Sequence, residues 1–297
     1  MTSSTSPVDP RLVPSSIASA DVAISDNVIS DFLQETLAMT QRLFIQLQRR
    51  PTTLFAGAIQ PLMWLILFGA LFVNAPQGFL GDDINYAKFL APGIIVFTAF
   101  SGALNAGLPV MFDREFGFLN RLLVAPLASR FSIVAASTIY IIALSFLQTA
   151  VIVGASAFLG ASLPGLGGLF AIAAIVFLIV LGVTALSLGL AFALPGHIEL
   201  IAVIFVTNLP LLFASTALAP LEFMAGWLQW IACLNPLTYA IEPIRTIYLN
   251  GASVGLGAEV IQTNFGALSF GVVLLLLVGF DALILVAIQP LLRRRIA

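Results

Sequence analysis

The segment "FSIVAASTIYIIALSFLQTAVIVGASAFLGASLPGLGGLFAIAAIVFLIVLGVTALSLGLAFALPGHI", residues 131–198, contains no Asp, Glu, Lys or Arg. A helix that crosses the hydrocarbon core of a bilayer needs about 20 mostly apolar residues. The segment is long enough for two such helices, and "LPGLGG" at 163–168 divides it with turn-forming residues. We therefore predict two membrane-spanning helices, near 131–159 and 169–194.

The composition of the whole chain agrees with a membrane protein. Of its 297 residues, 60% are hydrophobic and only 9% are charged, whereas charged residues make up roughly 25% of an ordinary soluble domain. A soluble core of this size would lack the charged side chains needed to cover it. We therefore expect an all-α integral membrane protein with six transmembrane helices. The remaining four lie near residues 52–73, 89–111, 200–217 and 268–290.

The distribution of Arg and Lys in the flanks of the spans predicts their orientation, because cytoplasmic flanks are enriched in basic residues. We expect both termini and the segment 111–130 to face the cytoplasm, in a multi-pass protein of the plasma (inner) membrane. One set of flanks carries Arg42, Arg49, Arg50, Arg114, Arg121, Arg130, Arg293, Arg294 and Arg295, and the other carries only Lys88 and Arg245.

Two elements precede the first span. Residues 1–27 are rich in Ser, Pro and Asp and lack an apolar core, which predicts a disordered cytoplasmic tail. In residues 28–50, apolar side chains recur at helical spacing and polar side chains fall on the opposite side. This pattern predicts an amphipathic helix that lies in the membrane interface. Residues 51–295 then form the six-span domain.

The segment 220–251 follows the fifth span and is expected on the outer face. Asn235 and Pro236 divide it, because Asn is a good N-cap and Pro suits the first position of a helix. We expect two short re-entrant or interfacial helices that close the exit path. The alternative, a seventh full span, would place the C-terminal "RRR" outside, against the charge rule. The residues of this outer gate are Glu222, Asn235, Pro236, Tyr239, Glu242 and Arg245.

Within this gate, Glu242 and Arg245 are three residues apart and are expected to pair across one helical turn. An exposed pair of this kind would contribute only about 0.2–0.5 kcal/mol. We therefore expect a modest loss of stability when Arg245 is replaced by alanine.

Several kinds of chemistry are missing from the sequence. A P-loop ends in Gly-Lys-Ser/Thr, and the only lysine is Lys88, in "NYAKF". His197 and Cys233 are the only residues of their types, so we expect no metal site, no catalytic set and no disulfide. A membrane-embedded enzyme is therefore disfavoured, and nothing in the sequence indicates binding of nucleic acid.

Asp281 is the one acidic residue expected near the middle of a span. The simpler interpretation is a carboxyl group hydrogen-bonded to a neighbouring helix, and the functional one is an intramembrane polar contact to substrate or to a partner helix. Ion-driven carriers generally need buried ionisable groups. An ion-coupled secondary carrier that acts without an ATPase therefore remains the alternative function, although it would need more such groups than Asp281.

The segment "MFDREFGFLNRLLVAPLASR", residues 111–130, concentrates charge in an otherwise apolar chain. Placing Arg or Asp at the bilayer centre costs about 2.5–3.5 kcal/mol per residue, so the segment is expected outside the hydrocarbon core. Phe and Leu residues alternate with the charges, which predicts a short amphipathic helix that could bind a groove on another protein. The alternative is a solvated interfacial helix that contacts only lipid.

Three stretches, taken in order, are similar to type-2 ABC export permeases. The likeness covers essentially residues 28–295. Phe118 and Asn120 depart from the Thr and Glu that are common in that family. The three stretches resemble, respectively, its second-span signature, its cytoplasmic segment and its late block: "YAKFLAPGIIVFTAFSGALNAG" (86–107), "DREFGFLNRLLVAPLASR" (113–130) and "PLLFASTALAPLEFMAGWLQWIACLNPLTYAIEPIRTIYLNG" (210–251).

The resemblance implies a permease subunit of an exporter of drugs, lipids, glycans or other amphiphiles. Such a subunit pairs with a second permease copy, as a homodimer or a heterodimer, and binds ABC ATP-binding subunits on its cytoplasmic side. ATP and Mg would then bind the partner subunit, and this chain would hold no cofactor. The segment 111–130 becomes the coupling helix, and its ATPase-coupling residues are Asp113, Arg114, Glu115, Phe116, Gly117, Leu119, Arg121, Leu122 and Pro126.

Overall fold

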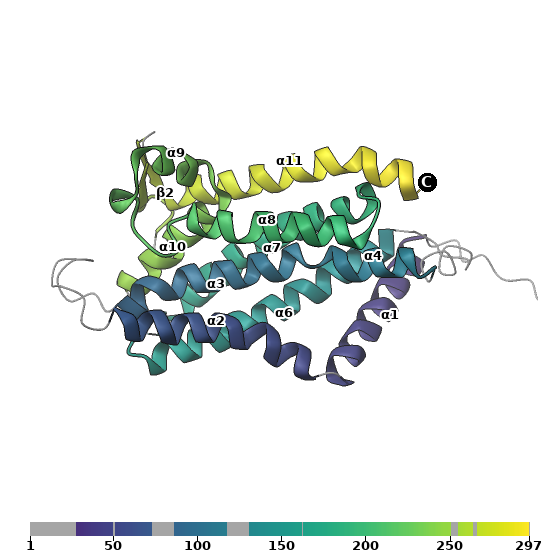
Figure 1. Ribbon diagram of the computed structural model, residues 1–297, viewed down its shortest axis with the longest axis horizontal. Helices are drawn as coiled ribbons and strands as arrows, with labels where there is room; N and C mark the ends of the chain where they lie inside the picture. The colour runs from purple at the N-terminus through teal and green to yellow at the C-terminus, as the bar shows by residue number, and fades with distance from the viewer. Residues whose placement is uncertain are drawn as a thin grey trace, which may run out of the picture.

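The long helices of the protein run side by side as one elongated bundle in the computed structural model (Figure 1). The core of the bundle consists of apolar side chains from most of these helices. The bundle helices are α2 (Pro51–Leu71), α3 (Tyr86–Leu104), α6 (Phe131–Phe158), α7 (Leu166–Ala193), α8 (His197–Phe213) and α11 (Phe270–Ile296). The structure describes residues 28–49, 51–72, 86–117, 131–161, 163–250, 255–263 and 266–296.

Shorter elements lie at the two ends of the bundle (Figure 1). One end holds α4 (Gly107–Glu115), α1 (Val28–Arg49) and the C-terminal end of α11. The opposite end holds η3 (Leu221–Phe223), α9 (Gly226–Leu234), α10 (Pro236–Asn250), β1 (Glu259–Thr263) and β2 (Gly266–Ser269).

The apolar helices agree with a membrane protein. Among the described residues, four helices are long and apolar enough to cross a bilayer: Lys88–Glu115, Ser132–Phe158, Leu166–Ala193 and Phe270–Pro290. Two shorter apolar helices, Gly57–Leu71 and His197–Phe213, occupy the places expected for the first and fifth spans. The six-span count itself stays a prediction, because these two are short for a full crossing.

Helix α7 packs closely against α11 through glycines. A Cβ atom added to Gly182 would lie 2.1 Å from Asp281 Oδ1, and one added to Gly189 would lie 2.8 Å from Ile288. Small residues let helix backbones approach closely in membranes, where packing replaces the hydrophobic effect as the force between helices. These two glycines, two turns apart, therefore hold α11 against the bundle.

The second predicted span is interrupted, which the sequence did not lead us to expect. Helix α3 ends at Leu104 and α4 begins at Gly107. The Ser187 hydroxyl of α7 lies in this break, where it donates to the Leu104 carbonyl (2.5 Å) and accepts from the Gly107 N–H (2.9 Å). A side chain that enters the helical hydrogen-bond ladder is a common cause of a kink.

The structure differs from the expected all-α fold in one hairpin of the described residues. It is formed by β1 and β2, whose strands pair antiparallel. Val260 and Ile261 are buried against the bundle, and Gly266 has a positive φ of 117° at the start of the second strand. The hairpin leads directly into α11. The fold is thus nearly all helical.

Candidate functional site

Arg114 lies in the last turn of α4 and binds the C-terminal end of α7. Its guanidinium donates to the carbonyl oxygens of Ala191 (2.8 Å), Phe192 (3.5 Å), Leu194 (2.6 Å) and Pro195 (2.7 Å). The last carbonyls of a helix have no partner within the helix and carry the negative end of its dipole. Arg114 therefore satisfies the end of α7 instead of projecting freely into solvent.

Glu115, the next residue, binds the start of α8. Its Oε1 accepts from the His197 backbone N–H (2.6 Å), and its Oε2 lies 2.5 Å from His197 Nδ1. A carboxylate is favourable at the N-terminus of a helix, where free N–H groups and the positive end of the dipole meet. A Cβ atom on Gly196 would lie only 3.0 Å from Glu115 Oε1, so glycine leaves room for the carboxylate.

Arg114, Glu115, Gly196 and His197 thus form a contact that we call the α4–α7–α8 joint. The Arg114 cation binds carbonyl oxygens at the end of α7, and the Glu115 anion binds the N–H at the start of α8. A single tight turn connects the two helices. Both side chains belong to the segment predicted to meet an ATP-binding subunit, and that role stays a prediction. Within this chain they bind the end of α7 and the start of α8.

Helix α4 ends directly after the joint. Gly117 has a positive φ of 73°, the left-handed conformation that commonly ends a helix. Phe116 beside it is 79% exposed. Asp113 is half-buried, and Arg42 of α1 interacts with its carboxylate electrostatically. The sequence-predicted residues Leu119, Arg121, Leu122 and Pro126 lie outside the described residues.

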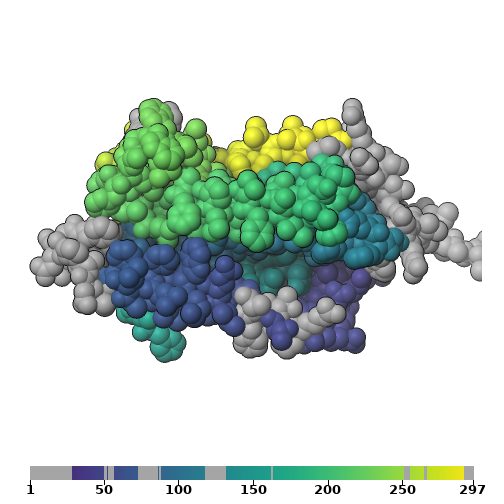
Figure 2. Space-filling model, viewed as in Figure 1, coloured from purple at the N-terminus to yellow at the C-terminus, as the bar shows by residue number. Residues whose placement is uncertain are grey.

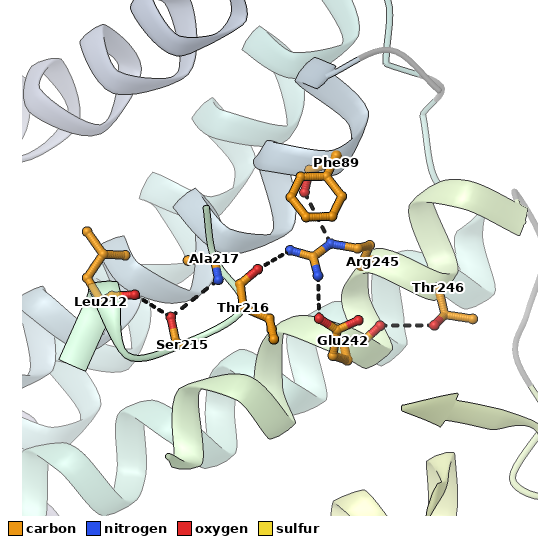
Figure 3. A network of polar contacts seen from close by, with 8 residues as sticks. All are labelled: Phe89, Leu212, Ser215, Thr216, Ala217, Glu242, Arg245 and Thr246. Atoms are coloured by element: carbon orange, nitrogen blue, oxygen red, sulfur yellow. Dashed lines mark hydrogen bonds and ion pairs between the residues drawn. The ribbon is translucent and has the colours of Figure 1, made fainter. Parts of the chain in front are cut away.

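The outer gate is built around Arg245 of α10, which is buried (Figure 3). Its guanidinium donates to Glu242 and to the carbonyl oxygen of Thr216, and its Nε donates to the Phe89 carbonyl at 3.3 Å. The guanidinium carbon also lies 3.8 Å from the centre of the Phe89 ring, close enough for a cation–π contact. Arg245 therefore connects α10 to α3 and to the turn after α8.

This network corrects one expectation from the sequence. The predicted Glu242–Arg245 pair is present, but its Arg side chain is only 6% exposed and its Glu side chain 16%. A buried pair that loses one partner leaves an uncompensated charge, which costs far more than the loss of a surface pair. The modest stability effect expected for an exposed pair therefore does not apply.

Asn235 joins the same turn to α10. Its side-chain oxygen accepts from the Leu237 N–H (2.9 Å), as an N-cap does. Its amide nitrogen donates to the carbonyls of Leu211 and Ala214, each at 2.7 Å, at the end of α8. Pro236 is the first residue of α10, so the helix start lies where the Asn-Pro step predicted it.

The other two outer residues have different surroundings. The Tyr239 hydroxyl donates to the Cys233 carbonyl at 2.5 Å, which ties α10 to α9. Glu222 is exposed and lines a hollow of about 290 Å³ together with Glu242 and Arg245. All six predicted gate residues thus belong to one end of the bundle, opposite the joint (Figure 1).

Asp281 is buried where α11 packs against α7, and it belongs neither to the joint nor to the outer gate. Its carboxylate faces Gly182, whose missing side chain leaves it room. Within the described part of the chain, neither carboxylate oxygen has a hydrogen-bond partner. The expected hydrogen bond to a neighbouring helix is therefore not formed, although the neighbouring helix is there.

The sequence did not identify three residues that contact these parts of the structure from distant positions in the chain. Ser187, Gly196 and Thr216 contribute a hydroxyl, space and a carbonyl oxygen respectively. The "PG" before His197 marked a turn, but no local pattern distinguishes Ser187 or Thr216 from other small polar residues in apolar segments.

Comparisons with known proteins agree with the architecture. Residues 34–249 match the family model described as ABC-2 type transporter. The chain is 54% identical over 250 residues to ycf38 of Cyanophora paradoxa, which is named as a transport permease, covering 84% of this chain and 86% of the relative. It is 53% identical over 266 residues to ycf38 of Porphyra purpurea, covering 90% and 91%.

A more distant relative carries a more specific name. Over 240 residues the chain is 28% identical to DrrC of Mycobacterium tuberculosis (strain ATCC 25618 / H37Rv), named as a doxorubicin resistance ABC transporter permease protein, covering 76% of this chain and 81% of the relative. These matches agree with the apolar helices of the structure, because both indicate a membrane protein. The chain belongs to the ABC-2 type transporter family and is a transmembrane permease subunit.

Proposed function

We propose that this chain, together with a second permease copy, forms the path by which an amphiphile such as a drug, lipid or glycan-like compound is exported across the plasma (inner) membrane. The energy comes from ATP hydrolysis, with ATP and Mg bound to a separate ABC ATP-binding subunit. Both chain termini face the cytoplasm in this proposal, and the membrane lipid is the surrounding solvent. The name of DrrC, a drug-resistance permease, supports a cargo of this kind.

The observation that carries the proposal is the α4–α7–α8 joint. It ties the end of α4, where the charged segment begins, to the end of α7 and the start of α8 by hydrogen bonds of 2.5–2.8 Å. A subunit that pushed on residues 113–130 would therefore act on three helices together. At the opposite end, the outer gate around Arg245 and Asn235 would cover the exit.

The proposal predicts that Glu115 transmits movement rather than attracting the partner. Glu115→Gln preserves the shape of the side chain and weakens both contacts to His197, because a charged acceptor makes the stronger hydrogen bonds. We expect the ATP-binding subunit to co-purify as it does with the unchanged permease, while the amount of cargo moved per ATP hydrolysed falls several-fold. Transport and ATP hydrolysis are measured together in sealed vesicles.

Glu259→Gln is the control, because Glu259 is an exposed carboxylate at the start of β1, at the end of the bundle opposite the joint. It should leave the ratio of transport to hydrolysis unchanged. An unchanged ratio in Glu115→Gln would contradict the coupling role of the joint. Failure of any ATP-binding subunit to co-purify with the unchanged permease would overturn the proposed function as a whole.

A further inference from the structure

A cavity of about 170 Å³, lined by both polar and apolar residues, lies among α2, α3 and α6. It borders Gly57, Trp64, Ser101, Gly102 and Gln148, and none of the residues that line it carries a formal charge. Its lining residues lie at 57–64 of α2 and 94–102 of α3, with Asn105 just after α3 and Gln148 in the second half of α6. The cavity therefore lies along the middle of the bundle rather than at one end. Figure 2 shows the face of the bundle on which α2 lies below α8.

One buried oxygen atom at this cavity lacks a hydrogen-bond donor, and a second oxygen, on the exposed backbone of Gly57, lacks the donor of a regular helix. The Gln148 side chain is only 7% exposed, and its Oε1 has no partner among the described residues. Pro61 lies one helical turn after Gly57 and has no N–H, so the Gly57 carbonyl lacks the donor that a regular helix would supply. Buried polar groups in proteins nearly always have partners, so a ligand that brings donors would complete this site.

The remaining groups limit what could enter. A Cβ atom on Gly57 would lie 2.6 Å from Gln148 Nε2, so glycine at this position allows the amide to extend between the helices. The Ser101 hydroxyl is already engaged with Asn208 Oδ1 at 2.9 Å. Trp64 stacks on Phe97, with ring centroids 5.9 Å apart, and gives the cavity an aromatic wall. Sugar-like rings, with hydroxyl donors at the edge and an apolar face, combine these features.

The size and position of the cavity favour part of an amphiphile over a whole soluble molecule. Sites for drug-sized ligands occupy about 300–1,000 Å³, so this cavity has room for a headgroup alone. Two of its lining helices, α3 and α6, are membrane-span candidates and α2 is a shorter apolar helix, which suits an acyl chain that remains in the bilayer. A cationic or anionic headgroup would find no opposite charge here to offset its desolvation.

We propose that this cavity binds the uncharged, hydroxyl-bearing headgroup of a lipid, with Gln148 Oε1 and the Gly57 carbonyl as its acceptors. The inference rests on the proposed function, in which such a lipid would be cargo. Gln148 is the specificity-determining residue, because its oxygen is the buried side-chain acceptor that only a donor-bearing ligand satisfies.

Trp64 provides the measurement. The chain has three tryptophans, so Trp227→Phe and Trp230→Phe together leave Trp64 as the single reporter. The full-length permease in phosphatidylcholine nanodiscs is titrated with monoglucosyl diacylglycerol that carries brominated acyl chains, which quench tryptophan at contact. Brominated phosphatidylcholine, which has no hydrogen-bond donor, gives the quenching expected from bulk lipid, and brominated phosphatidylglycerol tests a charged headgroup that bears hydroxyls.

We expect saturable quenching by the glucosyl lipid at mole fractions where the other two lipids follow the bulk line. Gln148→Leu should weaken this binding roughly five- to tenfold, the effect of one lost hydrogen bond of about 1 kcal/mol or slightly more. Gly102→Ala adds a methyl group 3.7 Å from Gln148 Oε1, an ordinary contact, and should weaken binding by filling space without disturbing the fold. Gln34→Leu on the exposed side of α1 is the matched control and should bind like the unchanged protein.

Quenching of the unchanged protein along the bulk line would overturn the proposal, and so would undiminished binding by Gln148→Leu. Equal competition by free methyl glucoside would assign the site to a soluble sugar and overturn the lipid assignment. The permease is tested without any ATP-binding subunit. Failure of this site is therefore distinguishable from failure of the proposed function, which the co-purification experiment tests.

Discussion

Arg245 is a buried cation at the outer end of the bundle whose partners come from three places in the chain. They are a carboxylate on its own helix, a main-chain carbonyl of α3 and another in the turn after α8. That turn is shaped by Ser215, whose hydroxyl donates to the Leu212 carbonyl (2.6 Å) and accepts from the Ala217 N–H (3.3 Å) (Figure 3). Gly93 of α3 lets the turn approach, since a Cβ there would meet the Ala217 carbonyl oxygen at 2.6 Å.

Replacement of Arg245 should therefore destabilise the protein strongly. Arg245→Met leaves the half-buried Glu242 without its cation and the Phe89 and Thr216 carbonyls without their donor, and we expect a loss of about 3 kcal/mol. The double change of Arg245→Met with Glu242→Leu should recover part of this loss, because no unpaired carboxylate remains. Thermal unfolding of the purified permease in nanodiscs measures both, with Glu222→Gln as the control for an exposed carboxylate nearby. Equal unfolding midpoints for Arg245→Met and Glu222→Gln would contradict the structural role given to Arg245.

For individual residues, the sequence predicted contacts between near neighbours in the chain better than burial by distant parts of it. The three-residue spacing of Glu242 and Arg245 predicted their ion pair, and the Asn235-Pro236 step predicted the helix start. The burial of Arg245 could not be predicted, because it depends on a carbonyl oxygen of Thr216 and the ring of Phe89, far away in the chain. Gln148 escaped notice for the same reason: its neighbours are on other helices.

Among the elements, the break between α3 and α4 depends on a hydroxyl group 80 residues further along the chain. Ser187 occupies the position where a continuous helix would have closed its own hydrogen bonds, and Gly107 allows the two helices to touch. The run of apolar residues predicted one span here correctly in position, but no local pattern signals an interruption that a neighbouring helix imposes.

Two glycines provide a matched test of this contact. A Cβ atom on Gly107 would lie 2.4 Å from the Ser187 carbonyl oxygen, so Gly107→Ala must push α4 and α7 apart, and we expect a loss of about 2 kcal/mol. Gly154 in α6 has nothing within 4 Å of the added methyl group among the described atoms, and Gly154→Ala should be neutral or stabilise by up to about 1 kcal/mol. Thermal unfolding of both variants decides the matter. A neutral Gly107→Ala would show that α3, α4 and α7 do not pack as described.

For the molecule as a whole, the apolar runs and the Arg bias of the sequence predicted the bundle and which elements share an end of it. They did not predict the β1–β2 hairpin, because a strand of five residues is too short to distinguish from loop by periodicity. They placed the segment 111–130 and the outer gate at opposite ends, but they did not predict the contacts at either end, which are made mainly to carbonyl oxygens that every residue type possesses.

The orientation of the bundle can be tested at its two ends. In a Cys233→Ala background, which removes the only cysteine, Phe116→Cys and Trp227→Cys place single thiols at residues that are 79% and 69% exposed. A membrane-impermeant maleimide added to spheroplasts, whose plasma membrane is intact and accessible, should label residue 227 and leave residue 116 unlabelled. Inverted vesicles should give the reverse pattern. Labelling of both from one side would show that the predicted topology is wrong.

On the far side of the contact, the α4–α7–α8 joint binds mostly peptide groups, together with the His197 ring. Arg114 takes four main-chain oxygens, and one of the two Glu115 contacts is to a main-chain N–H. Substitutions of Leu194 or Pro195 that keep the path of the turn should therefore leave the Arg114 contact in place, whereas Arg114 and Glu115 contribute to the joint through their own side chains.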